Sequence, residues 1–410
     1  MQPAKLKKPP PGKTWKEVNK ERREKRKQKN EEQLVKKARV EEEIKKKEEE
    51  KKINEVKKVS TLSVALPGSI LDNAQSPELR AYLAGQIARA ACIYKIDEVI
   101  VYDDKGEITE VERKKMKRDC TLGDARPCCL QLGRILQYLE CPQYLRKHLF
   151  PIHKDLQYAG LLNPLDAPHH LRQQDVYIYR EGVITNKPVK AGKGSMVYVG
   201  LQNDVRVDEV LTSGTRVTVK IPTEQEDPKK PHGIIVSAAV PRADTGIYWG
   251  YSVRLAANLS EVFAKCPYRD GYDMSIGTSD KGTPVDSIAP KSIKYKHALI
   301  VFGGLSGIES AVKVDPNINV DDASLVFNMY LNTCPLQGSR TIRTEEAILV
   351  TLAELRTKFN PEVPPPDNAQ FNHEPEHLNI DIEKKTNLIH ENFSQNNSED
   401  FEPNDFENSN

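Results

Sequence analysis

The run His297–Glu309, HALIVFGGLSGIE, constrains the fold of this chain more than any other stretch. After its first residue it is apolar at every position through Phe302. It then breaks into glycines at Gly303, Gly304 and Gly307. A fully apolar run is typical of a strand buried on both faces, as in the parallel sheet of an α/β domain. Because open α/β sheets bind ligands beyond the carboxyl ends of their strands, the run predicts a ligand site beside the glycines.

A second apolar piece, Leu325–Cys334, leads into the segment Pro335–Leu355. Within this segment Thr344 is expected to be the N-cap of a helix, because a threonine hydroxyl can accept a hydrogen bond from the first turn. Glu345 and Glu346 would then lie where acidic side chains suit the helix dipole. The residues that follow are almost wholly apolar, which predicts a buried helix.

The first part of the globular region predicts a strand–helix–strand unit. Leu62–Gly68 and Glu98–Asp104 are expected to be buried strands. Between them Ser76 fits a helix N-cap and Pro77 the first helical position. The residues Leu130–Phe150 are then expected to form one helix.

The pattern changes between residues 173 and 244. Five short, partly alternating runs, VYIYREGVI, SMVYVGL, VRVDEVL, TRVTVKI and GIIVSAAV, are separated by turn-forming residues. Several short strands with turn signals between them predict a small closed β-barrel.

Charge is unevenly distributed along the 410 residues. Residues 1–58 hold 22 Lys and Arg against 12 Asp and Glu, a net charge of +10, while residues 361–410 hold 2 against 12, a net charge of −10. The first segment is expected to be a partly helical basic arm that could contact phosphates or act as a nuclear import signal. The second is expected to be a disordered acidic tail.

Several classes of protein are not expected. No run of 18 or more apolar residues is present, so no membrane span is predicted. The seven cysteines show no CxxC spacing, so we expect reduced thiols in a cytosolic or nuclear compartment and no metal site. The GGxxG glycines depart from the dinucleotide fingerprint GxGxxG, and the phosphate loop GxxxxGK[ST] is missing, so a nicotinamide enzyme and an NTPase are both disfavoured.

Three segments resemble the cofactor-loop motifs of the SPOUT (SpoU/TrmD, α/β-knot) RNA methyltransferases, and most closely the eukaryotic and archaeal SPOUT-domain-containing branch. They are Gly271–Gly282, His297–Glu309 and Leu331–Ala353, and the resemblance extends from Thr61 to about Phe359. It implies a Rossmann-like parallel sheet with a C-terminal trefoil knot, formed by residues 59–172 and 245–360. It also implies an inserted OB-like β-barrel at residues 173–244.

The resemblance implies S-adenosyl-L-methionine as the methyl donor, bound in a bent form by three loops, Ile276–Gly282, Phe302–Glu309 and Asn332–Thr344. Glu309 could contact the cationic end of the donor or cap the helix that follows. The implied cofactor-binding residues are Ile276, Gly277, Thr278, Phe302, Gly303, Gly304, Glu309, Asn332, Thr333, Gln337, Gly338, Ser339, Ile342 and Thr344.

Two arginines before the expected helix are the candidate catalytic residues. Arg340 and Arg343 could hold an RNA phosphate or stabilise negative charge on a base carbonyl. The alternative is that one of them pairs with Glu345 or Glu346 and orders the loop. The sequence identifies no general base.

Contacts with RNA are expected from the inserted segment, since OB-type barrels often bind oligonucleotides. Basic side chains could meet the backbone and tyrosines could stack on bases, or the tyrosines could belong to the core and the lysines only solubilise the protein. The candidates within the insert are Lys187, Lys190, Lys193, Arg206, Arg216, Lys220, Lys229, Lys230, Tyr177, Tyr179 and Tyr198. Arg254, in the segment Tyr251–Leu255 that follows the insert, is a weaker candidate for RNA contact.

The resemblance therefore implies a homodimeric RNA methyltransferase of the nucleus, nucleolus or cytoplasm. Its substrate would be a structured RNA such as large-subunit rRNA or a hairpin, with uridine N3 as the target and the active site at the subunit interface. The alternative is an RNA-binding or scaffold protein of the mitotic spindle, centrosome or kinetochore with little or no catalysis.

Overall fold

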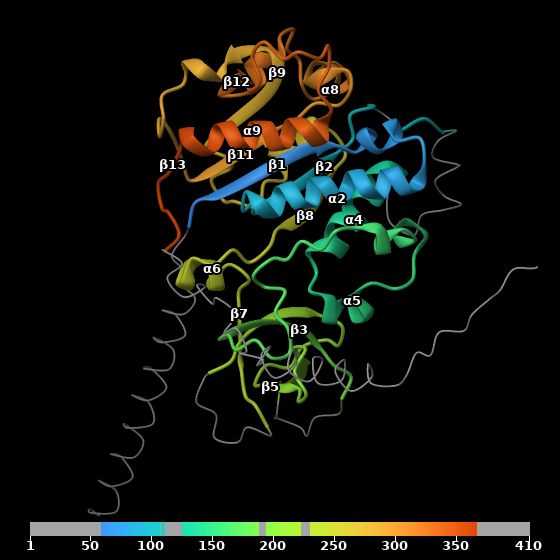
Figure 1. Ribbon diagram of the computed structural model, residues 1–410, viewed down its shortest axis with the longest axis vertical. Helices are drawn as coiled ribbons and strands as arrows, with labels where there is room; N and C mark the ends of the chain where they lie inside the picture. Colours follow the sequence, from blue (N-terminus) through green and yellow to red (C-terminus); the bar gives the residue numbers. More distant parts are fainter. Residues whose placement is uncertain (1–58, 107, 111–124, 188–193, 223–229, 367–410) are drawn as a thin grey trace, which may run out of the picture. The chain divides into compact units, whose positions relative to one another are not determined.

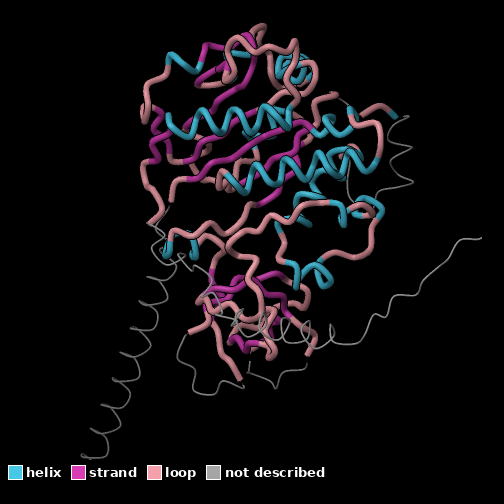
Figure 2. The backbone as a smooth tube through the Cα atoms, in the orientation of Figure 1, coloured by secondary structure: helices cyan, strands magenta, loops and turns pink. Residues whose placement is uncertain are grey.

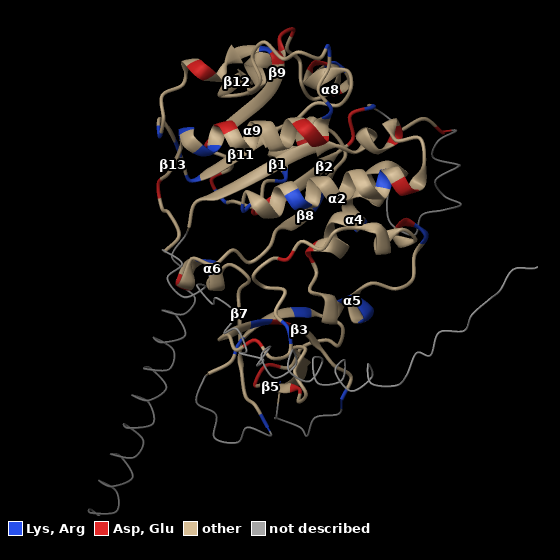
Figure 3. Cartoon of the chain, in the orientation of Figure 1, with Lys and Arg blue, Asp and Glu red and all other residues tan. Residues whose placement is uncertain are grey.

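A six-stranded sheet lies at the centre of the computed structural model, and every strand pairing in it is parallel (Figure 1). Its order is β12-β9-β11-β1-β2-β8. The two middle strands, β1 (Thr61–Pro67) and β11 (His297–Val301), contain no Lys, Arg, Asp or Glu (Figure 3). The parallel sheet predicted from the apolar runs is confirmed.

The structure describes residues 59–106, 108–110, 125–187, 194–222 and 230–366, which belong to one compact unit that ends at Pro366. The predicted basic arm, the tail beyond residue 366, Lys190, Lys193 and Lys229 lie outside these residues. Among the described helices none is long and apolar enough to cross a membrane.

Helices cover both faces of the parallel sheet (Figure 2). Alternate residues of β1 point to opposite sides, so that Val64 and Leu66 pack with helices α2, α4 and α9, whereas Ala65 packs with α7 and α8. The other strands are β2 (Glu98–Tyr102), β8 (Ser252–Ala256), β9 (Met274–Pro284) and β12 (Met329–Asn332). The helices are α2 (Pro77–Ile93), α4 (Pro127–Glu140), α5 (Gln143–Leu149), α7 (Leu259–Ala264), α8 (Gly307–Val314) and α9 (Thr344–Lys358).

The strand order reverses between β1 and β11. From β1 the chain adds β2 and then β8 on one side, whereas β11, β9 and β12 lie on the other side. In open α/β sheets the ligand crevice lies beyond the carboxyl ends of the strands at such a reversal. The topology therefore points to the loops that follow β1 and β11.

The start of α2 agrees with the sequence, but the long helix expected at residues 130–150 does not form. Oγ of Ser76 accepts a hydrogen bond from N of Leu79 at 3.3 Å, as an N-cap should. The expected long helix is broken between α4 and α5 at Pro142. Proline has no backbone N–H and disfavours the helical conformation in the residue before it, and Cys141 is accordingly extended.

The inserted segment forms a five-stranded antiparallel sheet with the order β5-β4-β3-β6-β7. N of Arg206 donates to O of Pro231 and N of Gly233 donates to O of Arg206, each at 2.9 Å, so β5 also contacts the approach to β7. The five predicted strands are all present. They are β3 (Tyr179–Ile184), β4 (Ser195–Tyr198), β5 (Val205–Val207), β6 (Arg216–Lys220) and β7 (Ile234–Val236), followed by helix α6 (Val240–Thr245).

A two-stranded parallel sheet completes the described chain. It joins β10 (Ile293–Tyr295) to β13 (Phe359–Pro361). N of Ser60 then donates to O of Val363 at 2.9 Å. Backbone hydrogen bonding thus continues into the first residues of the segment that was predicted to be a disordered tail.

Five 3-10 helices lie among the described residues. They are η1 (Gly68–Asn73), η2 (Lys154–Leu156), η3 (Ala159–Leu161), η4 (Val285–Ser287) and η5 (Ala323–Val326).

Candidate functional site

The first of the three loops is an excursion of β9 away from its neighbour β12. Gly277 pairs with Tyr330, and the next residue of β12, Leu331, pairs with Thr283. Residues 278–282 are therefore left out of the ladder and project at the carboxyl end of the sheet. The loop returns close to β12, because a Cβ added to Gly282 would lie 2.5 Å from the carbonyl carbon of Leu331.

The second loop follows β11 and contains glycines with different surroundings. A Cβ added to Gly303 would lie 2.4 Å from N of Ile308, so this glycine is needed for the tight start of α8. A Cβ added to Gly304 would instead lie 3.2 Å from Oδ2 of Asp104 and 3.4 Å from Oγ of Ser69. Gly304 therefore faces this polar pair and Pro67 at the sheet edge and not its own loop.

The third loop joins β12 to α9, and its start differs from the prediction. The N-cap residue is Arg343, whose N donates to Oε2 of Glu346 at 3.0 Å. Thr344 is the buried first residue of the helix, because its Oγ1 donates to O of Gly303 at 2.9 Å. The prediction of Thr344 as N-cap was therefore wrong. The helix is also buried on only one face, since Leu349 is 39% exposed.

Hydrogen bonds join the three loops to one another. Besides the Thr344 bond to the second loop, Oγ of Ser279 donates to Oε1 of Glu309 at 3.2 Å and joins the first loop to the second. Nδ2 of Asn332 donates to O of Asp280 at 3.0 Å and joins the third loop to the first. Segments that are far apart in the sequence thus form one continuous surface at the carboxyl edge of the sheet.

Glu309 is a partly buried carboxylate where the first and second loops meet. Burial alone would raise its pKa, but a hydrogen bond from the backbone at the start of α8 and the neighbouring Lys281 lower the pKa below its usual value. Nζ of Lys281 lies 3.3 Å from Oε1 of Glu309. Glu309 is therefore ionised at neutral pH, as either of its two expected roles requires.

The remaining predicted cofactor residues divide into buried supports and an exposed rim. Ile276 and Phe302 are buried, Thr278 donates to O of Val301 at 3.0 Å, and Thr333 shares a 2.6 Å hydrogen bond with Thr351. Gly277 also has a packing role, since a Cβ there would lie 2.5 Å from the ring of Phe327.

The rim is formed by the third loop. Around Gly338 no heavy atom lies within 4 Å of an added Cβ, and Nε2 of Gln337 donates to O of Ser339 at 3.1 Å. Ile342 is half-buried. The open face at Gly338 is where a ligand can reach the backbone.

The two candidate catalytic arginines also lie on this rim. The Arg343 side chain is 70% exposed, and its Nη1 lies 3.9 Å from Oε1 of Glu345. Such an exposed pair contributes about 0–1 kcal/mol, so it does not prevent Arg343 from contacting a ligand. Arg340 is exposed, and within the described part of the chain it makes no ion pair.

The basic candidates outside the loops have very different surroundings. Lys187 is 64% exposed and pairs with Asp204, and Arg206 is 43% exposed. By contrast, Nε of Arg254 donates to Oε1 of Glu98 at 2.8 Å, and its Nη2 donates to O of Val262 at 3.0 Å. The Arg254 guanidinium thus ties β8 to β2 and to α7.

Other candidates take part in packing. Nη1 of Arg216 donates to Glu140 at 2.6 Å, and Lys220 lies over the ring of Tyr179. Tyr179 is fully buried, and both it and Tyr177 pack against Trp249, which favours the core alternative for these two tyrosines. Tyr198 is half-buried and Lys230 is exposed.

Two residues of this edge were missed by sequence reasoning. Ser69 follows β1 and Asp104 follows β2, and Oγ of Ser69 donates to Oδ2 of Asp104 at 2.6 Å. Their position directly after two buried strands was the available signal, because carboxyl ends of parallel strands meet at one edge.

A parallel α/β fold with three bonded loops at its carboxyl edge is typical of a ligand-binding α/β domain. Comparisons with known proteins identify the family. Residues 61–355 match the family described as "Putative RNA methyltransferase". A protein of Drosophila melanogaster is 52% identical over 362 residues, which cover 86% of this chain and 74% of that protein. It is named 28S rRNA (uridine-N(3))-methyltransferase.

Two mammalian proteins have the same name. The protein of Mus musculus is 56% identical over 72% of this chain and 76% of its own length. The protein of Homo sapiens is 55% identical over 72% of this chain and 78% of its own length. The chain belongs to this family of RNA methyltransferases. The comparisons favour the enzyme over the scaffold alternative.

Proposed function

We propose that this protein transfers a methyl group from S-adenosyl-L-methionine to N3 of a uridine in large-subunit rRNA. The observation that carries the proposal is the set of three loops bonded together at the carboxyl edge of the sheet, one of which follows β11 where the strand order reverses. Relatives that match most of the chain are named for methylation of this atom in 28S rRNA. A substrate of this kind agrees with a nucleolar location.

The chemistry of the loops fits the methyl donor. S-adenosylmethionine carries a sulfonium cation, an adenine and an amino-acid group but no phosphate, so it needs backbone hydrogen-bond partners and an acid more than an anion cradle. The open surroundings of Gly338 leave the backbone accessible, and the ionised Glu309 suits a cationic group. When bound, the donor supplies the electrophilic methyl group. The chain's three loops would hold and orient it, since orientation is a large part of the catalytic effect.

We assign the RNA side of the site to the exposed rim. Arg340 and Arg343 project from the third loop and are suited to hold an RNA phosphate or a base carbonyl. The inserted sheet is proposed to be an OB-like barrel that contributes Lys187 and Arg206 to RNA binding. The backbone bonds of Arg206 to Pro231 and Gly233 support closure of this barrel.

We also propose that the third loop threads through the second to form the trefoil knot. Two contacts support this path. Thr344 is bonded to Gly303 within the second loop, and α9 then packs beside α2 on the same face of the sheet. A threaded loop would be held on both sides, which would stiffen the donor site.

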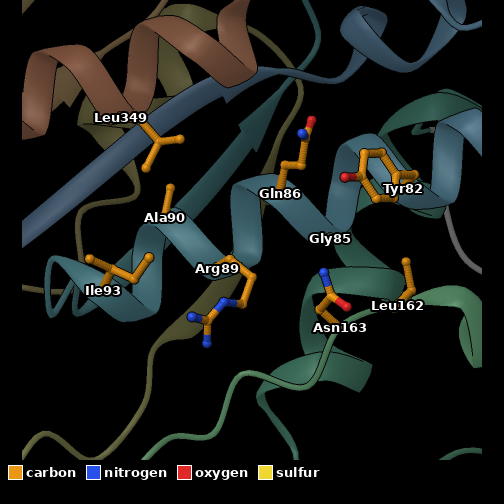
Figure 4. Close-up of a pocket in the computed structure, with 9 residues that line it drawn as sticks. All are labelled: Tyr82, Gly85, Gln86, Arg89, Ala90, Ile93, Leu162, Asn163 and Leu349. Carbon is orange, nitrogen blue, oxygen red and sulfur yellow. The ribbon is translucent and has the colours of Figure 1, made fainter.

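A second copy of this chain is proposed to cover the face formed by α2 and α9. A groove of about 200 Å³ lies there, and Figure 4 shows the apolar side chains that Tyr82, Ile93, Leu162 and Leu349 contribute to its lining. Tyr82 is 49% and Ile93 is 54% exposed. Exposed apolar side chains grouped in this way mark interaction sites, and the homodimer implied by the family supplies the partner.

The proposed reaction is tested by incubating the full chain with isotopically labelled S-adenosylmethionine and a large-subunit rRNA transcript. Mass spectrometry of the nucleosides should show labelled 3-methyluridine. The Gly304→Val variant, checked to be folded, should show none. Donor binding measured by calorimetry without any labelled nucleoside would contradict the proposed reaction.

A further inference from the structure

Two polar side chains that the assignments above leave without a role lie next to the glycine loop. Ser69 and Asp104 follow adjacent strands and share a 2.6 Å hydrogen bond. A Cβ added to Gly304 would lie 3.4 Å from Oγ of Ser69 and 3.2 Å from Oδ2 of Asp104. The consecutive strands β11, β1 and β2 therefore bring a glycine, a hydroxyl and a carboxylate together at the point where the strand order reverses.

The backbone on either side of the pair is fixed. Ser69 follows Gly68, where an added Cβ would lie 2.8 Å from Cα of Cys129, so the chain here lies directly on the first turn of α4. Asp104 follows Asp103, whose carboxylate accepts two hydrogen bonds from Nε of Arg126 at 2.7 and 3.0 Å. The surroundings hold the hydroxyl and the carboxylate in one arrangement before any ligand arrives.

The Asp104 carboxylate is not neutralised in the way its neighbours are. Nζ of Lys105 pairs with Asp72 at 2.6 Å and Arg126 pairs with Asp103, while among the described residues no cation pairs with Asp104. Oδ1 of Asp104 is buried and has no hydrogen-bond partner within the part of the chain that the structure describes. Because buried polar atoms are nearly always paired in folded proteins, this oxygen is left to accept a hydrogen bond or a proton from a ligand or a water.

We propose that Ser69 and Asp104 are the proton-accepting pair of the methyl transfer, an inference that rests on the proposed reaction at uridine N3. N3 of uridine carries a proton, and its lone pair must be freed to form a bond to carbon. The Ser69 hydroxyl accepts the N3 proton and passes its own proton to Asp104. As the N3–C bond forms, the bond between the methyl carbon and the sulfonium sulfur breaks, and the sulfur keeps the electron pair. The products are 3-methyluridine, S-adenosylhomocysteine and a protonated Asp104.

The first test compares Asp104→Asn and Ser69→Ala with the wild type in single-turnover methyl transfer to the rRNA transcript. Loss of a general base typically lowers a rate by about 100- to 10,000-fold, and we expect losses in this range for both variants. Affinity for S-adenosylhomocysteine and thermal stability should stay near the wild-type values. The double variant should be no slower than the slower single variant, because the two groups act as one unit.

The second test separates proton transfer from a structural role. The transcript is prepared with 5-fluorouridine in place of uridine, since the electron-withdrawing fluorine makes the N3 proton more acidic. The fluorinated transcript should raise the rate of Asp104→Asn at least about tenfold relative to the unmodified transcript, while the wild type gains much less. A purely structural defect would not respond to the acidity of the substrate.

The outcomes are distinguishable. If the wild type transfers methyl groups and both variants do so at the same rate, the pair is not the proton acceptor, although the proposed reaction stands. The pair is also not the proton acceptor if the variants are slow and the fluorinated transcript does not raise their rate, and the proposed reaction again stands. A wild type that methylates neither transcript contradicts the proposed reaction and this assignment together.

Discussion

Three glycines at the carboxyl edge of the sheet differ in what surrounds their missing side chains. Gly277 and Gly303 face the protein itself, at 2.5 Å from the Phe327 ring and 2.4 Å from the Ile308 nitrogen. Gly304 faces side-chain atoms of Asp104, Ser69 and Pro67 at 3.2–3.4 Å, so its surroundings are less tight than those of the other two. The sequence predicted all three as cofactor contacts, because a glycine needed for packing and one needed for a ligand look alike in a motif.

Substitution of adjacent glycines should separate these two roles. Gly303→Ala places a Cβ against backbone atoms and should destabilise the protein by about 1–3 kcal/mol, measured by urea unfolding. Gly304→Val places its Cβ 3.2–3.4 Å from side-chain atoms and not against the backbone, so it should cost less stability than Gly303→Ala. It should weaken donor binding by about a hundredfold in calorimetry, or about 2.8 kcal/mol. Unchanged donor affinity in the second variant would show that this loop does not hold the donor.

Arg340 provides a test of the RNA side of the site. Arg340→Ala should weaken binding to the rRNA transcript and reduce the slope of log affinity against log salt concentration by about 1, as expected for one lost phosphate contact. Arg356→Ala removes an exposed arginine near the other end of α9 and serves as the control. Equal effects of the two variants on the salt dependence would remove Arg340 from the binding surface.

At the scale of elements, α9 illustrates how a tertiary contact overrides a local preference. Thr344 has the right side chain for an N-cap, but its hydroxyl is bonded to Gly303 in a loop 41 residues away. Arg343 is the N-cap residue instead, and its backbone N donates a hydrogen bond to the carboxylate of Glu346. The break at Pro142, in contrast, is a local effect, because proline interrupts a helix wherever it stands in the interior. The prediction of one long helix followed the periodicity of apolar residues, which continues past this proline.

The Thr344 bond should matter for stability and for the donor site together. Thr344→Val keeps the shape of the side chain but leaves O of Gly303 without this donor, which should cost about 1–3 kcal/mol in urea unfolding. Donor affinity should fall as well, because the second and third loops lose their direct link. Thr341→Val, at an exposed position in the same loop, should change neither quantity. A stable Thr344→Val variant with full donor affinity would contradict this role of the bond.

At the scale of the whole molecule, a buried ionic cluster joins the inserted sheet to the parallel-sheet domain. Glu140 at the end of α4 accepts hydrogen bonds from Arg216 at 2.6 and 3.0 Å, and Arg216 also donates to Glu181 of β3 at 2.7 Å. Nε2 of His169 lies 3.1 Å from Oε1 of Glu140. Separating these groups would leave buried charges unpaired, so the cluster fixes the inserted sheet on its host.

This cluster predicts a loss of stability in acid. Burial raises the pKa of Glu140, but the charge and hydrogen bonds of Arg216, together with His169, lower the pKa to about 2 from the ordinary 4.5. Burial and the neighbouring His169 lower the pKa of His170 to about 4 from 6.5. Both groups bind fewer protons when folded. Stability should therefore fall as the pH drops from 6.5 toward 4 through His170, and from 4.5 toward 2 through Glu140.

Urea unfolding at a series of pH values measures this dependence. The Glu140→Gln variant should be less stable than the wild type at neutral pH, but its stability should fall less steeply below pH 4.5. An unchanged slope in this variant would show that other carboxylates dominate acid unfolding.

The proposed dimer face can be tested with one substitution. Ile93→Glu places a charge in the groove between α2 and α9, and an unpaired charge at a buried interface costs several kcal/mol. Sedimentation equilibrium should show a dimer for the wild type and a monomer for the variant. Val176→Glu alters a side chain that is 86% exposed outside the groove and should leave the dimer intact. A wild-type monomer would contradict the assignment.

The sequence by itself determined the parallel sheet, the positions of its central strands and the five strands of the insert, because runs of apolar residues and turn signals are local properties. The motifs were also sufficient to place the chain among the RNA methyltransferases. Only the tertiary structure decided which residues meet at the carboxyl edge. Ser69 and Asp104 are 35 residues apart and carry no motif, yet strand order and register bring them together beside Gly304. Neither order nor register can be read from one strand alone, since both depend on how every element packs against the others.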